Sequence, residues 1–113
     1  MKNSCCEYCF IPEGKKTIAN YFDTMKVWTK NVRKGFFKLV VGDCPLETLE
    51  THVFNEEKYI FNHYFKCACD CYCRSGICIR STVPILKRLR TLPENLVSEY
   101  KTKEDVIIGE DYV

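Results

Sequence analysis

The middle of the chain consists of consecutive segments that have the composition of β-strands. It reads Lys58-Tyr-Ile-Phe-Asn-His-Tyr-Phe-Lys66, then Cys67-Ala-Cys-Asp-Cys-Tyr-Cys73, and then Gly76-Ile-Cys-Ile-Arg-Ser-Thr-Val83. The first segment is aromatic, the second alternates with period two, and the third is rich in β-branched residues and stops at Pro84. With Arg74-Ser75-Gly76 as the turn between two strands, the sequence predicts an antiparallel hairpin lined with cysteine.

The sequence before this hairpin predicts two helices and another strand. Residues 16–30 carry apolar side chains at helical offsets, namely Ile18, Phe22, Met25 and Trp28. Residues 36–41 read Phe-Phe-Lys-Leu-Val-Val and form the clearest strand, which Gly42 and Asp43 close. Pro45 suits a first helical turn, and it is followed at helical spacing by Leu46, Leu49 and Val53. We therefore expect a short second helix there.

The sequence after the hairpin predicts further short elements. Ile85, Leu86 and Leu89 are expected to begin a short helix that Pro93 breaks. Leu96 and Tyr100 allow one more helical turn, and residues 106–108 are expected to form an edge strand. The sum is one α+β domain over residues 1–113, with a mainly antiparallel sheet, a central cysteine-rich hairpin and two to four short helices.

Composition narrows the class of protein. The 113 residues are 46% hydrophobic and 28% charged, which is typical of a folded domain. The net charge of +2 predicts no general affinity for nucleic acid or for an anionic membrane. Glu7 and Glu13 interrupt the apolar run that a secretory signal needs, and no stretch approaches the roughly 20 apolar residues of a membrane span. We therefore expect a cytoplasmic protein whose nine cysteines are reduced.

The cysteines are interpreted as part of the core, with zinc as the open alternative. On a straight strand, Cys67 and Cys73 would lie roughly 20 Å apart, too far for sulfurs that must all bind one zinc ion. Buried cysteine is otherwise a small hydrophobic residue, so no cofactor is expected. A chain that folds back could still bind zinc, and Cys6-x-x-Cys9 has the spacing of a zinc knuckle. The candidate ligands are Cys6, Cys9, Cys67, Cys69 and Cys78.

The sequence gives no sign of catalysis. His63 stands among aromatic residues, where a hydrogen-bonded structural histidine is the commoner outcome, and His52 stands near a predicted helix end. Adjacent carboxylates such as Glu56 and Glu57 would point to opposite faces of a strand. Phosphate-binding loops and hydrolase motifs are absent from the sequence. We therefore predict no catalytic residues and no enzymatic activity.

The acidic carboxyl-terminal segment is the predicted partner-binding site. Residues 104–112 read Glu-Asp-Val-Ile-Ile-Gly-Glu-Asp-Tyr and contain four carboxylates without a basic residue. Such a segment could dock on a basic protein surface, with an aromatic side chain as anchor. The alternative is an ordinary solubilising tail. The candidate residues are Glu104, Asp105, Glu110, Asp111 and Tyr112.

The hairpin region also resembles a known class of bacterial proteins. The segments His63-Tyr-Phe-Lys-Cys-Ala-Cys69 and Ser75-Gly-Ile-Cys-Ile-Arg-Ser-Thr-Val-Pro-Ile-Leu-Lys87 resemble small proteins encoded beside polymorphic toxins. These are the immunity proteins of contact-dependent growth inhibition and Rhs-type systems. The resemblance implies that the chain binds a cognate toxin domain, such as a nuclease, and covers its active site or substrate surface. The alternative function is a small zinc-binding or nucleic-acid-binding adaptor.

Overall fold

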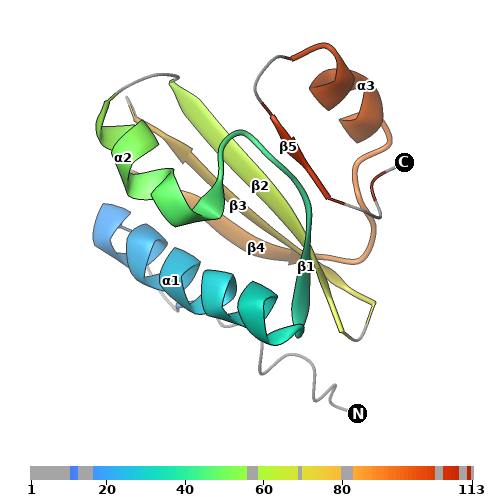
Figure 1. The fold of residues 1–113 in the computed structure, drawn as a ribbon, viewed down its shortest axis with the longest axis horizontal. Coiled ribbons are helices and arrows are strands. Elements are labelled where there is room, and N and C mark those ends of the chain that lie inside the picture. Colours follow the sequence, from blue (N-terminus) through green and yellow to red (C-terminus); the bar gives the residue numbers. More distant parts are fainter. Residues whose placement is uncertain are drawn as a thin grey trace.

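A computed structural model describes residues 11–12, 17–55, 59–68, 70–79, 83–103, 106–109 and 112 of the chain. Its elements are α1 (Ile18–Lys34), β1 (Phe37–Gly42), the 3-10 helix η2 (Leu46–Thr48), α2 (Leu49–Phe54), β2 (Ile60–Cys67), β3 (Tyr72–Cys78), β4 (Ile85–Leu89), α3 (Leu96–Lys101) and β5 (Ile107–Ile108). Figure 1 shows the helices packed around one twisted sheet. The predicted α+β class is confirmed.

The sheet is antiparallel throughout. Its strand order is β4-β3-β2-β1-β5, so β1 to β4 form a meander and β5 returns from the end of the chain to the outer edge of β1. The inserted helix α2 connects β1 to β2 (Figure 1). The predicted strand at 36–41, the short helix after Pro45, the helical turn at Leu96 and Tyr100, and the edge strand near the end are all confirmed.

Helix α1 is well defined at both ends. Thr17 caps its start, because the Asn20 N–H donates to Thr17 Oγ1 over 3.1 Å while the Thr17 N–H donates to Asn20 Oδ1 over 3.0 Å. Gly35 ends it in the left-handed conformation, with φ 87°. The helix predicted at 16–30 is therefore confirmed and extends to Lys34. No helix in the described part of the chain is long and apolar enough to cross a membrane.

Each face of the sheet carries its own apolar core. Beneath α1, the Trp28, Phe37 and Phe65 rings pack with centroid separations of 5.5–5.9 Å. On strand β2, Phe65 faces this core, whereas its neighbour Tyr64 faces the other side, where it meets Tyr100 of α3 at 6.3 Å. Helices α1 and α3 thus cover opposite faces of the sheet.

The central hairpin is present, but the predicted turn position was wrong. Phe65 pairs with Cys73 and Phe61 with Ile77, so Arg74, Ser75 and Gly76 lie inside β3 and the chain reverses between Cys67 and Tyr72. Asp70 adopts φ 71° and its N–H donates to Cys67 O over 3.0 Å, while the Cys67 N–H donates to Cys71 O over 2.8 Å. A three-residue hairpin loop requires such a left-handed residue, and aspartate tolerates it.

The role of Gly76 explains the misplaced turn. A Cβ at this position would lie 2.5 Å from Asn62 Oδ1 on the neighbouring strand. The glycine is therefore needed inside β3 because the Asn62 side chain packs closely against its backbone. Because the chain reverses before Tyr72, Cys67 and Cys73 belong to different strands and not to one. Both are buried in the core beneath α1, as expected. Cys71 packs partly against the same core.

The helix predicted from Ile85, Leu86 and Leu89 was also wrong. These residues form β4, which pairs with β3 so that Leu86 stands opposite Ser75 and Leu89 opposite Tyr72. The apolar spacing fits one turn of helix as well as a strand with one buried side chain, and only Leu86 of this strand is buried. The open edge of β3 decides between them, because pairing satisfies the backbone groups of both strands.

Replacement of Gly35 tests the end of α1. Gly35→Ala should lower the free energy of unfolding by about 1 kcal/mol, because a Cβ disfavours the left-handed conformation. No other atom lies within 4 Å of the added Cβ, so the effect comes from the backbone and not from a clash. Gly35→Asn should be milder, since asparagine visits this conformation more readily. Equal urea midpoints for wild type and both variants would contradict this account.

The buried tyrosines predict a loss of stability in alkali. Burial raises the pKa of Tyr21 and of Tyr100 above the ordinary value of 10.0. The folded chain therefore holds these protons more tightly than the unfolded chain, so stability is complete below pH 10 and falls as the pH rises above it. Unfolding in urea, followed at neutral pH and above pH 10, measures the loss. If the free energy of unfolding is unchanged across that interval, the pKa values of Tyr21 and Tyr100 are not raised by folding.

Candidate functional site

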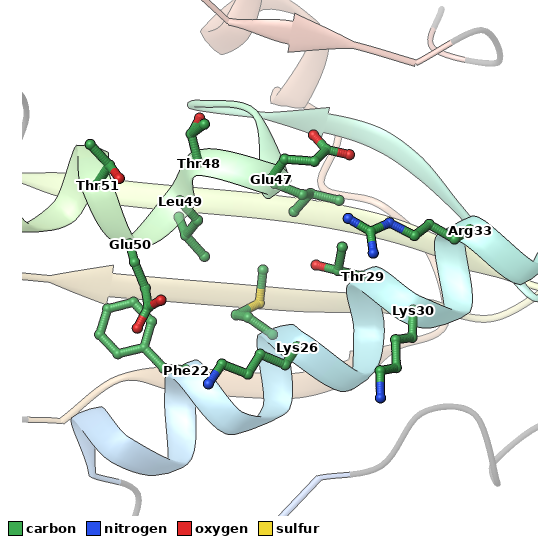
Figure 2. A pocket seen from close by; sticks show the side chains of 12 residues that line it. Phe22, Lys26, Thr29, Lys30, Arg33, Glu47, Thr48, Leu49, Glu50 and Thr51 are labelled. Carbon is green, nitrogen blue, oxygen red and sulfur yellow. The ribbon is translucent and has the colours of Figure 1, made fainter.

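The described residues form a groove between α1 and the η2–α2 segment. It has a volume of about 390 Å³ and is partly open to solvent. Figure 2 shows the side chains that line it. Its lining residues come from two short stretches of chain: Phe22, Met25, Lys26, Thr29, Lys30, Arg33, Leu46, Glu47, Thr48, Leu49, Glu50 and Thr51. This volume is near the lower end of the range for pockets that bind small ligands. It is also enough for a few side chains of a protein segment.

The floor of the groove is apolar and anchored in the core. Phe22 and Met25 face the sheet from α1, and Leu49 meets them from α2; all three are buried in the core cluster. The Phe22 ring also contacts the Phe54 ring at the end of α2, with centroids 5.6 Å apart. Phe54 is 69% exposed, so the apolar surface continues from the groove floor to an open aromatic side chain.

The two walls carry opposite charge. Lys26, Lys30 and Arg33 follow one another along α1 at offsets of four and three, which places them on one side of the helix. Glu47 and Glu50 face them from η2 and α2. Figure 2 shows Arg33 extending from α1 toward Glu47, whereas Lys30 points away from α2. All five charged side chains belong to exposed residues.

The threonine hydroxyls complete the polar part of the groove. Thr29 belongs to the α1 wall, and Thr48 and Thr51 belong to the opposite wall. A hydroxyl can both donate and accept a hydrogen bond, so these side chains suit a backbone or an amide as well as a charged group. The arrangement offers burial, oriented charge and adaptable hydrogen bonding, which are the components of a binding surface.

His63, on β2, has a structural role. The ring is fully buried, and its Nε2 lies 2.7 Å from Cys44 O, in the loop that follows β1. Gly42 makes room for it, because a Cβ there would lie 2.1 Å from His63 Cδ2. The interpretation of His63 as a hydrogen-bonded structural histidine is therefore confirmed. His52, expected near a helix end, lies half-buried in the last turn of α2.

The described part of the carboxyl-terminal segment is built into the fold. Ile107 and Ile108 pair with Gly42 and Val41 of β1, and the Gly109 N–H donates to Val40 O over 2.8 Å. The Tyr112 hydroxyl donates to Leu96 O over 3.0 Å, and its ring packs against the core beneath α3. Glu104, Asp105, Glu110 and Asp111 lie outside the described residues, so their part in binding stays a prediction.

The candidate zinc ligands are only partly placed. Cys67 ends β2 opposite Phe37, whereas Cys78 ends β3 opposite Ile60, at the other end of β2. Seven residues of extended strand, roughly 23 Å, separate these two ends, so Cys67 and Cys78 cannot bind the same ion. Cys6, Cys9 and Cys69 lie outside the described residues. Within the part that is described, no three metal-ligating side chains come together.

The groove itself is a site that the sequence did not predict. The one available signal was the series of Lys26, Lys30 and Arg33 on one side of the helix expected at 16–30. Glu47 and Glu50 gave no comparable signal, because the packing of α2 beside α1 depends on the long-range contacts of the core.

Comparison with known proteins adds no relative. No protein-family model matches the chain, and no curated protein or solved structure matches it.

Proposed function

We propose that this chain is a cytoplasmic binding protein that neutralises a cognate toxin domain by forming a stoichiometric complex with it. The observation that carries the proposal is the groove between α1 and α2, with its apolar floor and two oppositely charged walls. The resemblance of the hairpin to immunity proteins supplies the class of partner. In this account the groove takes an exposed segment of the toxin, and the complex covers the active site or substrate surface.

The groove suits a protein segment for three physical reasons. Phe22, Met25 and Leu49 are fixed by the core, so little side-chain freedom is lost when a partner binds over them. The exposed ring of Phe54 offers an aromatic contact of the kind that concentrates binding energy. The opposed charges favour one orientation of the bound segment, with its acidic side toward α1 and its basic side toward α2.

The acidic segment adds a second contact in this proposal. Glu104, Asp105, Glu110 and Asp111 would meet a basic surface such as the nucleic-acid cleft of a nuclease toxin, and they would steer the two proteins together. The described neighbours Ile107 and Ile108 pair with β1, and Tyr112 is hydrogen-bonded to α3. These attachments favour the role, because a tethered segment loses less entropy on binding.

Charge reversal tests the groove. Lys26→Glu with Arg33→Glu should weaken the complex with the cognate toxin by roughly tenfold or more, because the α1 wall would then repel an acidic segment. Titration calorimetry measures the affinity, and co-expression with the toxin measures protection of growth. The matched control is Lys101→Glu with Arg90→Glu, which reverses the same number of exposed charges away from the groove.

Two further variants make the groove test sharper. Exchanging all four charges, as Lys26→Glu, Arg33→Glu, Glu47→Lys and Glu50→Lys, keeps the net charge but reverses the polarity of the groove, and it should also abolish tight binding. Phe54→Ala should weaken binding without a comparable loss of stability, because the ring is largely exposed. If all groove variants bind as tightly as the wild type, the groove is not the toxin-binding site.

Neutralisation of the acidic segment tests the second contact. Glu104→Gln, Asp105→Asn, Glu110→Gln and Asp111→Asn together should slow association and reduce its dependence on salt. Deletion of the segment is unsuitable, because Ile107, Ile108 and Tyr112 contribute to the fold. Stopped-flow association at low and high salt provides the measurement. If the variant associates at the same rate as the wild type at low salt and again at high salt, these carboxylates do not belong to the binding site.

A further inference from the structure

Two cysteines face each other at the closed end of the central hairpin. Cys67 is the last residue of β2 and Cys71 immediately precedes β3, with a three-residue loop between them. The Cys67 N–H donates to Cys71 O over 2.8 Å, so the two residues form the last rung of the hairpin. Both side chains contact the core beneath α1, where Cys67 is 2% exposed and Cys71 is half-buried.

The spacing of such a rung is compatible with a disulfide. Residues directly opposite in an antiparallel pair have Cα atoms about 4.5–5.5 Å apart, and disulfides join Cα atoms about 4.4–6.8 Å apart. Cys67 and Cys71 carry reduced thiols in the structure. Other cysteines on these strands face different partners: Cys73 stands opposite Phe65 and Arg88, and Cys78 stands opposite Ile60.

We propose that Cys67 and Cys71 form a redox-active dithiol that closes to a disulfide by exchange with a low-molecular-weight disulfide such as oxidised glutathione. This inference does not depend on the proposed toxin partner. It assigns a modification site to the cysteine tract that was otherwise interpreted as core.

The exchange proceeds in two balanced steps. The Cys71 thiol, which is the more accessible, loses its proton and attacks the small disulfide; one small thiol leaves and takes up that proton. The Cys67 thiol then loses its proton and attacks Cys71 Sγ in the mixed disulfide, so the second small thiol leaves with the second proton. The chain is oxidised by two electrons, and the small disulfide is reduced to two thiols.

The surroundings of the hairpin end favour an anionic reagent. A second cavity, of about 190 Å³, lies there, and its lining includes Lys38, Lys66 and Cys67. Lys38 and Lys66 stand directly opposite each other on β1 and β2. Their positive charge attracts the carboxylates that oxidised glutathione carries. Asp70, with Oδ1 3.7 Å from Lys66 Nζ, is the acidic group at this cavity.

The test uses the full chain equilibrated with mixtures of reduced and oxidised glutathione. Reduced thiols are blocked with one alkylating reagent, and oxidised ones are then reduced and labelled with a second. Cleavage after Lys66 and Arg74 releases residues 67–74, and fragmentation of this peptide assigns the label to Cys67, Cys69, Cys71 or Cys73. We expect Cys67 and Cys71 to gain the second label together as the oxidised fraction rises.

Three variants separate the steps. Cys67→Ala should accumulate a glutathione mixed disulfide at Cys71, and Cys71→Ser should leave the buried Cys67 thiol reduced. Cys78→Ser, at the other end of β3, should behave as the wild type. Circular dichroism of each reduced variant shows whether it folds, and Cys71→Ser carries the test if the buried Cys67 position does not tolerate change. A disulfide that maps to Cys69, or thiols that stay reduced in every mixture, would overturn the proposal.

Discussion

The two-sided burial of the central strand β2 is the constraint on which the rest of the structure depends. Phe61, His63, Phe65 and Cys67 face the core beneath α1, while Tyr64 faces the core beneath α3. Because side chains alternate along a strand, a slip of one residue would exchange these two sets and bury the polar Asn62 and Lys66 instead. The pairing of β2 with β1 and β3 is therefore specified by packing on both faces.

Hydrogen bonds and an ion pair at the loop after β1 connect that loop to β2 and to the end of α3. The Asn62 N–H donates to the buried Asp43 Oδ2 over 2.7 Å, and the Tyr100 hydroxyl donates to Asn62 O over 3.0 Å. Lys103 Nζ lies 3.7 Å from Asp43 Oδ1, which compensates the charge of a carboxylate that is only 2% exposed. One polar network thus joins β1, β2 and α3, and it fixes the loop from which η2 and α2 start.

The groove is a consequence of the same arrangement. Helix α1 is held on the sheet by Trp28 and its aromatic neighbours, and α2 is held by Leu49 and Val53 in the same core. Each helix buries one side in the core. The exposed flanks of the two helices form the charged walls of the groove between them. The charged walls of the groove are therefore built from exposed residues on helices that the core positions, and its floor is part of that core.

The type and position of most helices and strands could be predicted from local sequence patterns. Helical spacing at Ile18, Phe22, Met25 and Trp28, and the β-branched and aromatic run at 36–41, are local patterns that one helix or one strand satisfies without help from the rest of the chain. The sequence also indicated that cysteine lines the central hairpin, although Cys67 and Cys73 lie on different strands and not on one.

Features that depend on neighbours distant in sequence were set by long-range contacts. The open edge of β3 made a strand of Ile85 and Leu86, and close approach to Asn62 placed Gly76 inside β3 and not in its turn. The packing of α2 beside α1 brought Glu47 opposite Arg33, and the loop at Asp70 brought Cys71 opposite Cys67. The physical reason is the same in each case: local propensities there are nearly balanced, and long-range pairing and burial settle the outcome.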